Sequence, residues 1–271
     1  MNEEDVSAFA SKILLATDGS PEAERAARMA VTLSNGLGSE LHVLRVGGVP
    51  SAYYGYSEAE MFGRQYQILR ARAEEYVRER LDEEAEKIRA IGGEVAGSHA
   101  GAGSADAEIL RFAEELGAGL VILGSRGFGP LRRALMGSVS SSVVRHSRGS
   151  GLVVRGGLAK FMTPVAEPED NLIESLRCIG VGLDGSKEAR AASRAAVEIS
   201  NATSSELHVV YSLNTELWRS YPGQIIANTR EEDLEDLEES KRKAGAWIDR
   251  QAERIRAEGA KVEEVHLAFG K

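Results

Sequence analysis

The residues best suited to chemistry form a glycine-spaced segment in the first half of the chain. Gly124-Ser125-Arg126-Gly127 follows a short apolar run, and Gly137-Ser138 comes after nine intervening residues, where a helix is expected to begin. Glycines let the backbone approach an anion closely, and the amides of a helix N-terminus attract phosphate. The segment therefore predicts a phosphate site, and the alternative is a turn-rich connection without a ligand. It is neither a Walker loop nor a dinucleotide fingerprint, since it lacks both spacings.

Asp18 is the second candidate, at the end of the apolar run 12–17 and just before an expected helix. In a doubly wound sheet, ligands bind beyond the carboxyl ends of the strands, where the strand order reverses. With the order 3-2-1-4-5, Asp18 would face the Gly124 loop across one crevice. A carboxylate there suits a ribose hydroxyl, or a metal ion and its water. The alternative is that Asp18 caps the next helix, a role for which Ser20 competes.

Alternating strands and helices must position these residues. The apolar runs and the turn residues predict strands at 12–17, 41–46, 95–99, 120–123 and 152–155. Between them we expect helices at 21–35, 67–91, 105–116 and 138–147. This alternation is typical of a parallel α/β sheet with helices on both faces. The segment 47–65, rich in glycine and tyrosine, is expected to be a loop.

The first part of the chain is repeated in the second. The segment 13–43 aligns without a gap with 179–209, and about half of the positions are identical. We therefore expect two tandem, doubly wound, Rossmann-like parallel sheets of order 3-2-1-4-5, in domains 1–155 and 178–271 with a linker at 156–177. The second copy contains no counterpart of 103–155. The favoured explanation is a C-terminal portion beyond Lys271, and the alternative is completion by partner chains.

Composition limits the classes of function. The chain has 271 residues and a formal net charge of −9, which argues against a nucleic-acid-binding surface. The acidic N-terminus does not resemble a signal peptide, and no apolar run is long enough to span a membrane. The only cysteine, Cys178, excludes an intrachain disulfide and is expected to fill space rather than react. We expect a cytoplasmic protein.

Several of these segments together resemble the universal stress protein family, in its tandem-domain, ATP-binding form. The likeness rests on Ile13–Ser20, Gly103–Leu110, Gly117–Ser125, the spaced glycines that follow, and Leu152–Arg155. It covers nearly all of the first copy and the first half of the second. The resemblance implies ATP, AMP or ADP as cofactor, with Mg²⁺ held indirectly through Asp18. It also implies pairing of domains through the fifth strand, either in a homodimer or within the chain.

The resemblance assigns the binding residues by position. The adenine contacts would be Ala16, Thr17, Val46 and Leu123. The sugar and metal side would be Asp18 and Gly124. The phosphates would meet Arg126, Gly127, Gly137, Ser138, Val139 and Ser140. In the second copy, Leu183 and Ser212 replace Thr17 and Val46, so no site is assigned there.

Three functions remain open at this point. The leading hypothesis is an adenine-nucleotide-binding regulator of the stress response. The second is slow ATP hydrolysis, for which the motif offers no convincing general base. The third is an interaction module that dimerises without nucleotide.

Histidines and tyrosines supply weaker candidates. His42 and His208 occupy equivalent positions and are expected to be core or supporting histidines rather than ligands, and His99 and His266 are equivalent as well. Because no cysteines or carboxylates cluster at ligand spacing, a structural metal site is not expected. Four tyrosines could form a lid over adenine or, as the favoured alternative, a partly buried flap on their own domain: Tyr53, Tyr54, Tyr56 and Tyr66.

Overall fold

The computed structural model describes residues 9–49, 63–127, 136–155, 176–214 and 231–270. The chain divides into two compact units, Met1–Leu172 (unit 1) and Ile173–Lys271 (unit 2), each treated separately below. Three expectations fall outside the described residues: most of the tyrosine-containing loop, the 128–135 part of the glycine segment, and the linker up to 175. Within the described ranges, no helix combines the length and the apolar character needed to cross a membrane.

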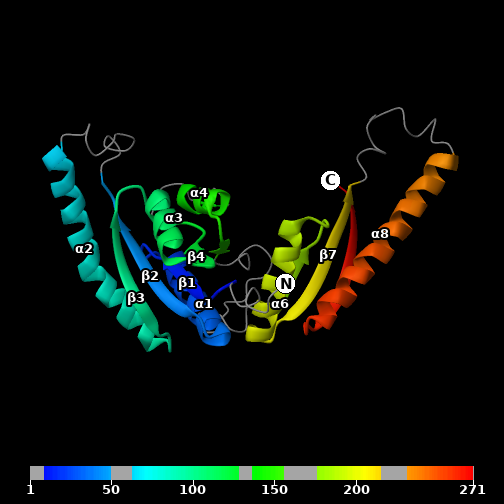
Figure 1. Ribbon diagram of the computed structural model, residues 1–271, viewed down its shortest axis with the longest axis horizontal. Helices are drawn as coiled ribbons and strands as arrows, with labels where there is room; N and C mark the ends of the chain where they lie inside the picture. Colours follow the sequence, from blue (N-terminus) through cyan, green and yellow to red (C-terminus); the bar gives the residue numbers. More distant parts are fainter. Residues whose placement is uncertain (1–8, 50–62, 128–135, 156–175, 215–230, 271) are drawn as a thin grey trace, which may run out of the picture. The chain divides into compact units, whose positions relative to one another are not determined.

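Unit 1 has the predicted architecture. Its five strands are all parallel and lie in the order β3-β2-β1-β4-β5, as expected (Figure 1). The strands are β1 (Lys12–Ala16), β2 (Glu40–Gly47), β3 (Val95–Ala102), β4 (Leu120–Gly124) and β5 (Ser150–Val154). The helices are α1 (Pro21–Leu37), α2 (Gly63–Ala90), α3 (Ala105–Leu116) and α4 (Ser138–His146).

Helices cover both faces of this sheet. Figure 1 shows α2 running along β2 and β3, and α1 contacts α2. On the other face, Leu14 and Leu44 pack with Ile109 of α3 and Val143 of α4 in one apolar cluster. Because side chains alternate along a strand, the neighbouring buried residues of β1 point to the opposite face. A sheet covered on both faces needs continuous apolar strands, which explains the uninterrupted apolar run of β1.

Several predicted boundaries are wrong, including the start of α2, which lies at Gly63 instead of Gln67, and two of them have a clear local reason. Helix α1 does not end near Asn35-Gly36, because Gly38 takes the left-handed conformation (φ 67°) that ends it after Leu37. Strand β3 does not end at His99 but continues to Ala102. Its last residues pair with the end of β2, from Arg45 to Gly47, and this pairing keeps the backbone extended.

Unit 2 repeats the first half of unit 1. It contains β6 (Cys178–Gly182), α6 (Lys187–Thr203), β7 (Glu206–Asn214), α8 (Glu231–Ala257) and β8 (Val262–Gly270). The three strands are parallel in the order β6-β7-β8, which corresponds to β1-β2-β3. Both helices pack on one face, where Leu207 and Val209 meet Ile248 and Ala252. Cys178 is exposed on β6, an edge strand of this three-stranded sheet, so its expected role as a space filler is wrong.

Each unit has a histidine pair between its second and third strands. In unit 1, Nδ1 of His42 lies 3.1 Å from Nε2 of His99, and in unit 2 the corresponding atoms of His208 and His266 are 2.9 Å apart. His42 is buried, and the ring of His99 packs against Phe112 of α3. Burial, and secondarily the nearby His42, lower the pKa of His99 below its ordinary value of 6.5.

The two copies of β1 provide a matched stability test. Ile13 is fully buried between helical layers, whereas the equivalent Ile179 is only partly buried. Replacing Ile13 with alanine should cost about 2–5 kcal/mol of unfolding free energy, because a cavity adds to the lost transfer free energy. Ile179→Ala should cost clearly less. Urea-dependent amide hydrogen exchange, which resolves the two units, is the measurement; equal losses would contradict this account of the two sheets.

The lowered pKa of His99 predicts a pH dependence. As the pH falls below about 6.5, the unfolded chain takes up a proton before folded unit 1 does. The stabilisation that neutral His99 contributes is therefore fully present above pH 6.5. It is lost as the pH falls towards the lower pKa that His99 has in the folded state. Unfolding free energies measured between about pH 7.5 and 5.5 should fall less steeply for His99→Gln than for the unaltered chain. Identical slopes would show that His99 does not carry the effect.

Candidate functional site

A cleft opens in unit 1 at the carboxyl ends of β1 and β4, where the strand order reverses. Its volume is about 140 Å³. Most of the residues predicted for the site line it: Ala16, Thr17, Asp18, Val46, Leu123, Gly124, Arg126, Gly127, Val139 and Ser140. Gly137 and Ser138 are not among the lining residues, although they form the N-cap and first residue of α4.

Four lining residues were not predicted: Ala23, Leu44, Ala105 and Ile109. Leu44 lies two residues before Val46 on β2 and so shares its face, which strand periodicity alone would have indicated. Ala105 and Ile109 belong to the first turns of α3. Ile109 packs with Leu14 and Leu44 on the face of the sheet where the cleft opens.

Asp18 faces the glycine segment, as expected. A Cβ atom added to Gly127 would lie 2.2 Å from Oδ2 of Asp18, so only hydrogen fits between them. The other carboxylate oxygen, Oδ1, accepts the backbone N–H of Ser20 at 2.9 Å. Ser20 itself is the N-cap of α1, since its hydroxyl accepts the N–H of Ala23. The alternative in which Asp18 caps α1 is therefore wrong.

Arg45 of β2 fixes the turn that carries Asp18. Its Nη2 donates to the backbone carbonyl of Asp18 at 2.8 Å, and its Nη1 lies 3.7 Å from Oε1 of Glu84 on α2. The Glu84 side chain is only 9% exposed and also lies 3.2 Å from Nζ of Lys87. Gly19 fits beneath Arg45 with φ at +80°, where a Cβ would come within 3.0 Å of the guanidinium. The sequence patterns did not predict that Arg45 and Glu84 hold this turn in place.

Gly124 permits an unusually close approach between β4 and the start of α1. A Cβ at this position would lie 2.8 Å from the backbone carbon of Glu22, so no other residue fits without displacement. The hydroxyl of Ser140 donates to the carbonyl of Gly124 at 2.8 Å, and the N–H of Gly137 donates to the carbonyl of Ser125 at 2.8 Å. These bonds hold the N-terminus of α4 against the end of β4.

The N-terminus of α4 supplies donors at the edge of the cleft. The first turn closes with the bond from the N–H of Ser141 to the carbonyl of Gly137. The N–H groups of Ser138, Val139 and Ser140 precede that bond and have no acceptor within the helix. The hydroxyl of Ser140 already donates to the carbonyl of Gly124. The backbone N–H of Ser140 is therefore the donor that remains for an anion. The helix dipole favours negative charge at the same point.

Arg126 brings a positive charge to the cleft. Its Nη2 lies 3.9 Å from Oε1 of Glu22, and both side chains are only about a quarter exposed. A phosphate approaching the α4 amides would compete with Glu22 for this guanidinium. Among the described lining residues, Asp18 and Arg126 are the only ionisable side chains.

Asp106 joins α3 to α4 across one side of the site. The hydroxyl of Ser104 donates to Oδ1 of Asp106, and that of Ser142 donates to Oδ2 at 2.7 Å. These bonds, led by that from Ser104, hold the pKa of the Asp106 carboxyl below its usual range. The two helices that border the cleft are therefore fixed to each other.

The cleft thus has an apolar part and a polar part. Its apolar wall is formed by side chains of β1, β2, β4 and α3, including Ala16, Leu44, Ile109 and Leu123. Its polar edge contains the carboxylate of Asp18, the guanidinium of Arg126 and the amides of α4. This arrangement suits a ligand with a flat apolar group at one end and an anionic group at the other.

Unit 2 repeats the aspartate turn without the opposing wall. Oδ1 of Asp184 accepts the N–H of Ser186 at 2.8 Å, and Ser186 caps α6 as Ser20 caps α1. Hydrogen bonds from Ser186 lower the pKa of Asp184. The part of unit 2 that the structure describes contains no counterpart of β4 or α4, so Asp184 faces no glycine segment there.

Several solved structures resemble nearly the whole chain, among them the following two. A universal stress protein from Archaeoglobus fulgidus DSM 4304 gives a TM-score of 0.61 at 22% identity, covering 98% of this chain and 79% of that chain. A putative universal stress protein from Pseudomonas aeruginosa UCBPP-PA14 gives 0.56 at 17% identity, covering 98% and 76%. Both likenesses establish the fold.

A universal stress protein solved in complex with cAMP also matches, with a TM-score of 0.37 and 20% identity over 52% of this chain and 94% of that chain. That similarity is too weak to carry the ligand over. A search of curated proteins found no significant match.

The family model described as the universal stress protein family matches the chain in two segments, 10–155 and 176–271. The first contains the whole cleft, and the second contains the repeated sheet of unit 2. Since the two matches together span most of the sequence and agree with the repeated strand order, this protein belongs to the universal stress protein family and carries two copies of its domain.

Proposed function

We propose that unit 1 binds an adenine nucleotide, ATP in the first instance, and that the protein acts as a nucleotide-dependent regulator in the stress response. The observation that carries the binding proposal is the meeting of Asp18, the glycine segment and the α4 N-terminus around one apolar cleft. Family membership supports the regulatory role.

The two parts of the cleft suggest how the nucleotide lies. The adenine ring would pack among Ala16, Thr17, Val46 and Leu123, which line the apolar wall. The ribose would meet Asp18, whose Oδ2 points towards Gly127. The phosphates would then extend past Gly127 and Arg126 to the amides of Ser138, Val139 and Ser140.

A magnesium ion would enter with the nucleotide. Carboxylate oxygen and water are ligands that Mg²⁺ prefers. Asp18 is the one carboxylate among the described lining residues, so it would hold the ion indirectly, through water on the phosphates. We do not expect rapid hydrolysis of ATP. The carboxylate of Asp18 already accepts the N–H of Ser20 and is therefore a poor general base.

Filling the space beside Asp18 should weaken ATP binding. Gly127→Ala places a methyl group where Oδ2 of Asp18 lies, which displaces the carboxylate or blocks the ribose position. Calorimetric titration with ATP and Mg²⁺ should show an affinity at least about tenfold weaker, equivalent to about 1.4 kcal/mol. Gly245→Ala on α8 is the matched control, since its Cβ would meet nothing within 4 Å. Unchanged affinity in Gly127→Ala would overturn this placement of the nucleotide.

The Arg126–Glu22 pair tests the direction of the phosphates. Arg126→Gln should weaken ATP binding about tenfold while leaving adenosine binding nearly unchanged, because a charge-assisted bond to phosphate is lost. Glu22→Gln should strengthen ATP binding, since it removes the competing carboxylate 3.9 Å from the guanidinium. Equal losses of ATP and adenosine affinity in Arg126→Gln would place the phosphates elsewhere.

A further inference from the structure

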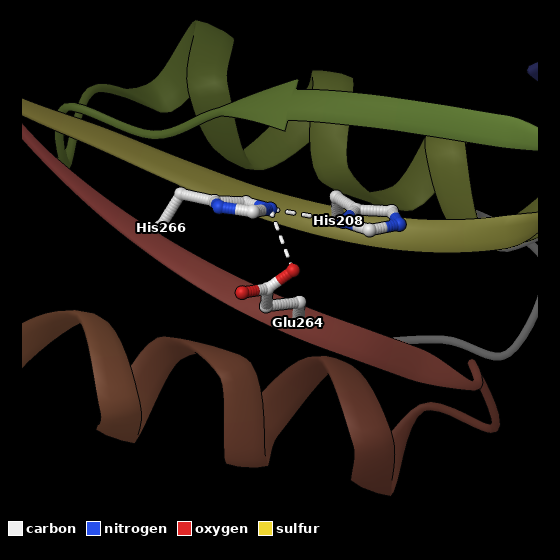
Figure 2. Close-up of side chains that lie close together, drawn as sticks. All are labelled: His208, Glu264 and His266. Atoms are coloured by element: carbon white, nitrogen blue, oxygen red, sulfur yellow. Dashed lines mark hydrogen bonds and ion pairs between the residues drawn. The ribbon is translucent and has the colours of Figure 1, made fainter.

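Three potential metal ligands gather on one face of the sheet in unit 2. They are His208 of β7 and Glu264 and His266 of β8 (Figure 2). In the parallel register His208 pairs with Glu264, and His266 lies two residues further along β8. Side chains two residues apart on a strand share a face, so the backbone itself brings the three together. Sequence spacing did not predict this cluster, because the two histidines are 58 residues apart.

The ligand atoms are spaced as a small metal ion requires. Nδ1 of His208 lies 2.9 Å from Nε2 of His266, which lies 3.7 Å from Oε2 of Glu264. All three atoms are within 4.8 Å of one another. Tetrahedral bonds of about 2.0–2.1 Å separate two zinc ligands by roughly 3.3 Å. The observed distances lie on either side of that value, so small side-chain rotations would complete the geometry.

Among the residues that the structure describes, the three ligands are accessible to solvent. Leu207 and Val209 point to the face on which α6 and α8 pack, so His208 points to the other face. No helix from the described residues of unit 2 covers that second face. The side chains of His266 and Glu264 are 40% and 64% exposed. A hydrated ion can therefore reach the three ligands and keep water in a fourth position.

Unit 1 has the same histidine pair without the third ligand. His42 pairs in register with Gly97, which stands where unit 2 has Glu264. A Cβ at Gly97 would lie only 2.8 Å from Nδ1 of His42, so a carboxylate cannot be added there. Glu40 approaches the other nitrogen of His42, Nε2, at 3.4 Å, away from the point where the two rings meet. The carboxylate facing both imidazoles is thus specific to unit 2.

We propose that His208, Glu264 and His266 bind a divalent transition metal ion, with Zn²⁺ as the best match. Two imidazoles and one carboxylate suit Zn²⁺ better than Mg²⁺ or Ca²⁺, which prefer oxygen ligands. Within the described residues, no lysine or arginine forms an ion pair with Glu264, so its charge is available to offset that of the ion. Binding replaces the hydrogen bond between the rings. Whichever ring donates that bond moves its proton to its other nitrogen, so both facing nitrogens offer lone pairs to the metal.

Zinc titration of the full chain, freed of metal and nucleotide, tests the site. Calorimetry should show one Zn²⁺ bound per chain through these ligands. Glu264→Gln should weaken that binding at least tenfold, and His208→Gln with His266→Gln should remove it. His42→Gln with His99→Gln is the matched control and should leave it unchanged. Zinc binding as tight in Glu264→Gln and in the double variant of unit 2 as in the unaltered chain would overturn the proposal.

A second measurement avoids any effect of substitution on folding. Imidazole nitrogen NMR of the unaltered chain should show the signals of His208 and His266 shifting on addition of one equivalent of Zn²⁺, while those of His42 and His99 stay in place. Shifts confined to other histidines, or none, would contradict the site. Because nucleotide is left out, the result is independent of ATP binding in unit 1.

Discussion

The site in unit 1 depends on one steric constraint, the close approach of the β1–α1 turn to the segment after β4. Hydrogen is the only side chain that fits at Gly124 against the backbone of Glu22, or at Gly127 against Asp18. Two parallel strands end side by side in any such sheet, but their following loops normally spread apart. Here the glycines let the loops come together, and the cleft lies directly beside them. The hydrogen bonds of Ser140 and Gly137 then fix α4 to this junction.

Local signals in the sequence predicted much of this arrangement. Strand periodicity and helix caps gave the element order, and the topology of a doubly wound sheet placed Asp18 opposite the glycine segment. The glycines were predicted to let the backbone approach an anion, whereas in the structure Gly124 lies against Glu22 and Gly127 against Asp18. The resemblance to a family supplied the assignment of individual residues, and most of them line the cleft.

What could not be predicted depends on partners distant in the sequence. Glu84 is one of many acidic residues on a long charged helix, and nothing local distinguishes it as the buried partner of Arg45. The cluster at His208 escaped notice for the same reason, since its members meet only through the β7–β8 register. The end of β3 was misplaced because pairing with β2, rather than the propensity of Gly101 and Ala102, keeps that stretch extended. The two units share the order of their first three strands, but polar groups on those strands differ, as Gly97 and Glu264 show.

The contact of Arg45 with both the Asp18 turn and Glu84 has a mechanical consequence. The turn that faces the cleft cannot shift independently of α2, because one guanidinium is bonded to its carbonyl and paired with a nearly buried carboxylate of that helix. Any movement of the turn must either carry α2 with it or separate a charge pair that is shielded from water. Displacements of α2 and of the Asp18 turn are therefore expected to be coupled through Arg45.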